Sequence, residues 1–226
     1  MVIEIATNLI ILIFSVIIHE IAHGWVALKC GDSTARDAGR LTLNPLPHID
    51  PFMTLFLPAF LALQSALLHG PGIIFGGAKP VPVNPYRLRG GQRDHVKVSF
   101  AGAGANILLA LAAFLLCLPV LVLGRHSPSG LPGAVIPLLL RVVQINLILA
   151  NFNLLPIPPL DGSWILGYFL RGEARRWYAS LQARGFQAFL VFMIAAWLIP
   201  GLMNLAFFPF RAGYGALIRI LLLVAG

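Results

Sequence analysis

The sequence predicts an all-α fold, a multi-pass transmembrane helical bundle. Of its 226 residues, 58% are hydrophobic and only 11% are charged, and the mean hydropathy is +0.86. Soluble domains carry about 25% charged residues. The apolar residues are gathered into runs, several near the roughly 20 residues that a helix needs to cross a bilayer. We therefore expect an integral membrane protein with one membrane-embedded domain over residues 1–226, with a core over 1–170 and C-terminal helices over 171–226.

Apolar runs succeed one another along the whole chain, at residues 2–28, 51–68, 96–123, 134–155, 186–208 and 216–225. The first run has no basic leader and is longer than the core of a signal peptide, so we expect it to stay as a mature helix. The last is too short to span a bilayer alone. Residues 76–85 read GGAKPVPVNP, and these prolines favour a short extended, β-like segment associated with the membrane.

Lysine and arginine are concentrated in three loops, after the first run, before the third and after the fourth. Positively charged loops stay on the cytoplasmic side, so all three loops are expected there. The run at 51–68 must then enter and leave on one face, and we expect it to be re-entrant. The formal charge of +8 suits contact with anionic lipid and gives no reason to expect nucleic-acid binding.

Within the first run, residues 19–23 read HEIAH. On a helix, His19 and His23 share one face about 6 Å apart along the axis, so two imidazoles can hold one ion. Zinc lowers the pKa of bound water to about 7, and the neighbouring Glu20 can take its proton and pass it to a leaving amine. Ionisable groups at membrane depth are usually functional. The motif therefore predicts peptide hydrolysis with one Zn²⁺ inside the membrane, although two histidines could also simply bond neighbouring helices.

A catalytic zinc usually takes three protein ligands and keeps one open position. We expect Asp161 to be the third ligand, because it ends a run of prolines, NLLPIPPLDG over 153–162, that must break a helix. Non-helical backbone at membrane depth is tolerated where it lines a cavity. Asp161 could instead cap the helix that follows it. His48 and Asp50 are the competing candidates for the third ligand.

Three segments together resemble the site-2 protease family of intramembrane zinc metalloproteases: the HEIAH run, the NLLPIPPLDG run, and AGAGAN over 101–106. The resemblance implies that His19, His23 and Asp161 bind zinc and that Glu20 is the base, in agreement with the assignments made above. It covers about the first three quarters of the chain and corresponds to a short form without PDZ or CBS domains. Ala103 departs from the family pattern, which commonly has proline there.

Asn106 and Asn153 are polar residues in apolar runs, so each needs a partner. We expect them to contact the substrate or the oxyanion of the scissile carbonyl, and a hydrogen bond between helices is an equal alternative for each. The extended segment at 76–85 is expected either to receive an unwound substrate as an added strand or to be a stiff linker.

The sequence thus predicts an intramembrane zinc endopeptidase that cuts a membrane-protein substrate in or near a transmembrane segment. Its partners would be this substrate and the lipid bilayer. We expect a multi-pass protein of a prokaryotic cell membrane, with the active site toward the cytoplasm. The alternative is a catalytically inactive protein that binds a metal or transmembrane helices in the membrane. The sequence carries no sign of the oligomeric state.

Overall fold

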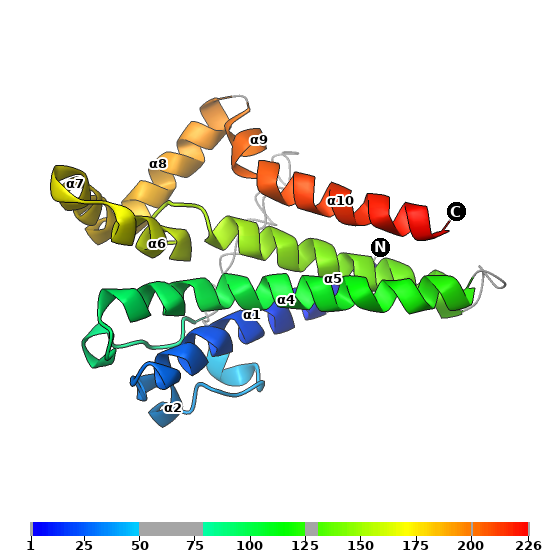
Figure 1. Cartoon of the computed structure of the whole chain (residues 1–226), viewed down its shortest axis with the longest axis horizontal. Helices are drawn as coiled ribbons and strands as arrows, with labels where there is room; N and C mark the ends of the chain where they lie inside the picture. The colour runs from blue at the N-terminus through cyan, green and yellow to red at the C-terminus, as the bar shows by residue number, and fades with distance from the viewer. Residues whose placement is uncertain (1, 50–78, 125–130, 200, 226) are drawn as a thin grey trace.

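The architecture of the chain was analysed in a computed structural model, which describes residues 2–49, 79–124, 131–199 and 201–225. Three long helices form the frame of the bundle: α1 (Val2–Lys29), α4 (Gln92–Gly124) and α5 (Leu131–Asn153). Each contains a stretch long and apolar enough to cross a membrane. In Figure 1, α1 and α5 run in one direction and α4 runs between them in the other. The predicted helical membrane bundle is confirmed.

Helices α2, α6 and α7 lie at one end of this frame, whereas α10 runs along it (Figure 1). Before α4 come α2 (Thr34–Asp37) and two 3₁₀ turns, η1 (Leu46–His48) and η3 (Pro85–Arg87). After α5 come α6 (Asp161–Phe169), α7 (Gly172–Ala183), α8 (Gly185–Leu198), α9 (Leu202–Ala206) and α10 (Phe208–Ala225). Helices α7 and α8 meet at 92° and could form a fourth, broken span.

Helix α1 ends for an identifiable reason. Lys29 lies in its last turn, where a cation is favourable at the negative end of the helix dipole. Gly31 follows with φ 108°, a conformation that glycine adopts without strain. The Asp32 N–H donates to the Ala27 carbonyl at 2.9 Å and so closes the helix end. The chain then turns into the loops at the end of the bundle where the HEIAH motif lies.

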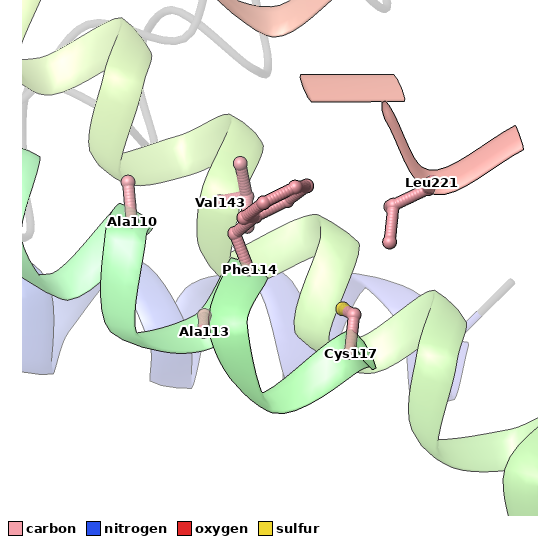
Figure 2. Close-up of a cluster of buried hydrophobic side chains, with 6 residues drawn as sticks. All are labelled: Ala110, Ala113, Phe114, Cys117, Val143 and Leu221. Atoms are coloured by element: carbon pink, nitrogen blue, oxygen red, sulfur yellow. The ribbon is translucent and has the colours of Figure 1, made fainter. Parts of the chain in front are cut away.

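The larger of two buried hydrophobic clusters in the described residues lies where α4, α5 and α10 meet (Figure 2). Small side chains on α4 let these helices approach closely, and Leu221 of α10 completes the cluster. Its buried members are Ala110, Ala113, Phe114, Cys117, Val143 and Leu221. This packing fixes α4, which faces the candidate site, against α5, which leads into the segment that carries Asp161.

The predicted run at 186–208 is not one helix. Helix α8 stops at Leu198, and Gly201 has φ 93° at the start of α9. The sequence there is Pro200-Gly201, a pair that ends helices because proline lacks an N–H and glycine accepts positive φ. Conversely, the run at 216–225 belongs to a longer helix, since α10 begins at Phe208.

The predicted re-entrant segment at 51–68 lies outside the described residues. The residues on either side of that part of the chain do meet: the Lys79 N–H donates to the His48 carbonyl at 2.8 Å. This contact holds the loop after α1 against the start of the extended segment.

Candidate metal centre and active site

His19 and His23 project from the same face of α1, as their spacing predicts. Both are buried, with 6% and 9% of their surface exposed. Their Nε2 atoms lie 2.9 Å apart. Two imidazoles of one helix thus point their outer nitrogens at a common spot.

Asp161 reaches this spot from the other side of the bundle. Its Oδ2 atom lies 3.2 Å from the Nε2 of His19 and 3.2 Å from the Nε2 of His23. Asp161 is the first residue of α6, and the preceding Leu160 is extended. Because helix α6 is capped by Leu160 without a side-chain hydrogen bond, Asp161 does not have the capping role that was its alternative.

The turn before Asp161 is built by the prolines and by close backbone packing. Helix α5 ends at Asn153, and the Leu160 N–H donates to the Ile157 carbonyl at 2.9 Å. Gly162 packs so tightly that a Cβ placed on it would lie 2.2 Å from the Leu154 carbonyl oxygen. The Tyr178 hydroxyl of α7 donates to the Pro156 carbonyl at 2.9 Å. These contacts fix the position of Asp161 relative to the two histidines.

The three ligand atoms form a triangle with sides of 2.9, 3.2 and 3.2 Å. Zinc–ligand bonds of about 2.0–2.1 Å in a tetrahedron place neighbouring ligand atoms about 3.3 Å apart, so the separations suit one zinc ion. Within the described residues, His19, His23 and Asp161 form the one group of at least three metal-ligating side chains close enough to share an ion.

The hydrogen bonds behind the histidines favour a cation between them. The His23 Nδ1 lies 2.6 Å from the Val98 carbonyl oxygen, and the His19 Nδ1 lies 2.7 Å from Asn106 Oδ1. Both partners accept, so each Nδ1 donates, and a neutral ring then presents its lone pair at Nε2. Asp161 Oδ2 is buried without a hydrogen-bond partner. With both rings neutral, three acceptors converge here, and they repel one another unless a cation lies among them.

Space for an ion is kept by Gly102 of α4. A Cβ on Gly102 would lie 2.4 Å from His23 Nε2 and 2.5 Å from His19 Nε2. Any larger residue would therefore fill the place where the three ligand atoms meet. The donor set and this space both fit a catalytic zinc, which is held by imidazole nitrogen and carboxylate oxygen.

Glu20 lies beside the ligands and lines a cavity of about 270 Å³ together with His19, His23 and Asp161. Its Oε2 accepts a hydrogen bond of 2.7 Å from the Val81 N–H. Val81 belongs to the extended segment predicted between the second and third runs. The contact orients the carboxylate of Glu20 within the cavity.

The described part of the extended segment, from Lys79, has no strand assigned to it. It is tied to the end of α1 and to the loop beyond, because Arg40 donates to the Lys79 carbonyl at 2.6 Å and the Asn84 N–H donates to Asp32 at 2.6 Å. Asp32 is fully buried. Burial raises the pKa of its carboxyl, but hydrogen bonds from Thr34 and Asn84 outweigh burial and lower that pKa below its usual value.

The remaining predicted residues are placed as follows. Asn153 lines the cavity, and its Nδ2 donates to the Leu149 carbonyl of its own helix at 3.0 Å. Asn106 is 0% exposed, and both of its polar atoms bond other protein groups, so it has no group left for a substrate. His48 bonds the Thr42 carbonyl at 3.0 Å and is not in the ligand cluster. Asp50 lies outside the described residues.

Sequence reasoning assigned no role at the metal centre to Val98, Gly102 or Val81. The first two had a signal, because residues 98, 102 and 106 repeat the four-residue spacing of the histidines that they face. Val81 had no such signal in the sequence, because its role depends on how the extended segment folds back over α1.

A buried HExxH helix that meets a carboxylate from a proline-broken segment inside an apolar bundle defines a class of membrane-embedded metallopeptidases. The chain belongs to one family of this class, peptidase family M50, the site-2 protease family. The model of peptidase family M50 matches residues 131–200, which include Asp161.

Curated relatives extend the similarity over most of the chain. A protein of Bacillus subtilis named "Putative zinc metalloprotease YwhC" is 37% identical over 185 residues, which are 82% of this chain and 78% of that protein. The Rip2 proteins of Mycolicibacterium smegmatis and Mycobacterium tuberculosis strain H37Rv carry the same description. They are 30% and 31% identical over 80% and 83% of this chain, which spans 64% and 65% of their lengths. No solved structure matches this chain significantly.

Proposed function

We propose that this chain is an intramembrane zinc endopeptidase that hydrolyses a peptide bond in or near a transmembrane segment of a membrane-protein substrate. One observation carries the proposal: two imidazoles of α1 and the carboxylate of Asp161 converge within 3.2 Å of one another in a site that has Glu20 beside it. Membership of a peptidase family supports it.

The cofactor is Zn²⁺, in accord with the names of the relatives and with the donor set, and His19, His23 and Asp161 are the residues that hold it. When bound, the ion supplies Lewis acidity, which lowers the pKa of water to about 7 and polarises a carbonyl group. The protein itself supplies two oriented imidazoles, a charged carboxylate and the space beside Gly102.

Glu20 is the general base and then the general acid. Its carboxylate takes a proton from the attacking water while the bond between the water oxygen and the carbonyl carbon forms. It then gives that proton to the amide nitrogen as the C–N bond breaks, so the products are a carboxylic acid and an amine, which ionise at neutral pH. The Val81 N–H holds Oε2 and so fixes the carboxylate for both transfers.

The substrate is a transmembrane protein, and a helix must unwind before its peptide bond is accessible. Asn153 and Val83 line the same cavity as Glu20, which supports a role for both in holding an unwound chain. We assign to Asn153 a contact with the substrate backbone or with the developing oxyanion. The Val83 N–H has no partner within the described residues, and it is a donor to which the substrate backbone can add as a strand.

The site faces the cytoplasmic side in this proposal. Lys29 ends α1, and Arg36 and Arg40 follow this helix, at the end of the bundle that holds the HEIAH motif. The basic residues before α4 lie at the same end (Figure 1). An excess of such residues marks cytoplasmic loops. A prokaryotic cell membrane is consistent with bacterial relatives.

The Glu20→Gln variant tests this function directly. The amide cannot take the proton, so cleavage should fall by about 100-fold or more, the contribution typical of a general base, while the zinc content stays that of wild type. The assay uses the purified chain in lipid vesicles with a panel of tagged single-span membrane segments, and each cut is located by mass spectrometry. Glu4→Gln on the same helix is the matched control and should cleave like wild type.

Equal cleavage by wild type and Glu20→Gln would overturn the proposed mechanism. If wild type binds zinc and the tagged segments but cuts none of them, the alternative of a metal-binding or helix-binding protein without catalysis is favoured instead.

A further inference from the structure

One face of α4 lies directly against the histidine pair and consists of Val98, Gly102 and Asn106. These three residues, which we call the α4 stripe, are spaced by four, as His19 and His23 are. We propose that the α4 stripe is a positioning device that sets the tautomer and the orientation of both imidazoles for the metal. This inference rests on the proposed zinc site and adds residues that act through the metal ligands rather than on the reacting atoms.

The two ends of the α4 stripe each hold one histidine. The Val98 carbonyl accepts from His23 Nδ1 at 2.6 Å, and Asn106 Oδ1 accepts from His19 Nδ1 at 2.7 Å. A partner that can only accept forces the ring proton onto Nδ1 and leaves the Nε2 lone pair for the metal. Because residues 98 and 106 lie two turns apart on one rigid helix, both rings are fixed against the same support.

Val98 accepts through its backbone, but Asn106 must be turned the right way by other groups. Its Nδ2 donates to Asn146 Oδ1 at 2.8 Å and to the Ser15 carbonyl at 3.2 Å, so its Oδ1 faces His19. The Asn146 Nδ2 in turn donates to the Ser15 hydroxyl at 2.9 Å and to the Val142 carbonyl at 3.0 Å. The amide orientation is thereby set by α1 and α5 together.

This network is completely buried, since Asn106, Asn146 and Ser15 are 0%, 1% and 4% exposed. A buried polar network is costly unless every member is satisfied, and here one acceptor is satisfied by the metal-facing histidine itself. Packing between helices does not require such a chain of amides. Because this hydrogen-bond network ends at His19, it acts on the metal site.

The middle of the α4 stripe contributes space. A Cβ on Gly102 would lie within 2.5 Å of both Nε2 atoms, whereas a Cβ on Gly104, one half-turn away, would meet only the Phe100 ring at 3.4 Å. Gly102 and Gly104 are thus a matched pair on one helix, in which only the first faces the ligands.

The test measures zinc affinity of the full-length chain in detergent by competition with a chelator, together with the visible spectrum of the Co²⁺-loaded protein. Asn106→Leu and Gly102→Ala should each lower zinc affinity by about 10–100-fold, the typical effect of losing an outer partner of a metal ligand. Both should also alter the Co²⁺ spectrum. Asn106→Asp keeps an acceptor for His19 Nδ1 and should recover most of the affinity that Asn106→Leu loses.

Two controls separate positioning from general stability. Asn151→Leu removes an amide of α5 that donates to the Ala206 carbonyl at 3.0 Å, away from the metal site, and Gly104→Ala adds a methyl group away from the ligands. Both should bind zinc like wild type. If Asn106→Leu does not fold, the zinc affinity of Gly102→Ala is compared with that of Gly104→Ala. A lower affinity of Gly102→Ala alone then supports the role of the α4 stripe.

Zinc affinities of Asn106→Leu and Gly102→Ala equal to those of their controls would overturn the positioning role. Absence of zinc binding by wild type would instead reject the metal centre itself, so the two failures are distinguishable.

Discussion

The two sides of the metal centre are held in place by different means. On the histidine side, both rings come from helix α1, and hydrogen bonds to Val98 and Asn106 of α4 fix their Nδ1 atoms. On the aspartate side, Asp161 Oδ2 has no hydrogen-bond partner. The position of Asp161 is set instead by the backbone turn before it and by the close packing of Gly162.

This difference shows where each side is vulnerable. The histidine side depends on a network of side chains from three helices, so it should respond to the loss of single hydrogen bonds. The aspartate side depends on the path of the backbone, so it should respond to added volume and to anything that loosens the turn. A membrane bundle can thus combine a preorganised pair of ligands with a third ligand delivered by a broken helix.

The largest expected effect on the aspartate side comes from Gly162→Ala. Its methyl group would lie 2.2 Å from the Leu154 carbonyl oxygen, and backbone cannot move aside as a side chain can. We expect the free energy of unfolding to fall by about 3 kcal/mol, the upper end of the usual cost of overpacking. Zinc affinity should fall as well, because the turn that carries Asp161 is displaced.

Gly167→Ala is the control on the same helix. Its methyl group would meet the flexible end of Gln182 at 3.2 Å, which can move, so stability and zinc affinity should change little. Stability is measured by chemical unfolding in detergent. Equal effects of the two variants would show that the turn is not the element that positions Asp161.

A smaller effect is expected for Tyr178→Phe, which removes the hydroxyl that donates to the Pro156 carbonyl. The loss of this one hydrogen bond should cost about 1 kcal/mol of unfolding free energy and lower zinc affinity modestly. The matched control is Tyr214→Phe, because the Tyr214 hydroxyl has no hydrogen bond within the described residues. If Tyr178→Phe and Tyr214→Phe bind zinc equally well, the contact of α7 with the turn plays no part in placing the ligand.

A feature of the site could be predicted from the sequence when residues close together in the chain determine it. A feature that depends on contacts between distant residues could not. The histidine pair is local, because four-residue spacing on a helix brings two side chains together wherever the helix lies. The broken segment before Asp161 is also local, since its prolines cannot continue a helix. Each of these features was therefore predictable without knowledge of the fold.

The role of Asn106 was not predictable in the same way, because it depends on a contact between residues 19 and 106. From the sequence, an asparagine in an apolar run could face a substrate or a neighbouring helix, and only the packing of α4 on α1 distinguishes the two. The contact between Val81 and Glu20 is similarly non-local. The break between α8 and α9 was visible in the sequence as Pro-Gly, but the apolar composition around it favoured one continuous run.

The central claim is that His19, His23 and Asp161 bind one zinc ion together, and metal analysis of the purified protein tests it most directly. Wild type should contain one zinc per chain, while His23→Ala and Asp161→Ala should each lose it, since removal of a ligand costs more affinity than the 10–100-fold of an outer residue. A wild-type level of zinc in Asp161→Ala would contradict the account.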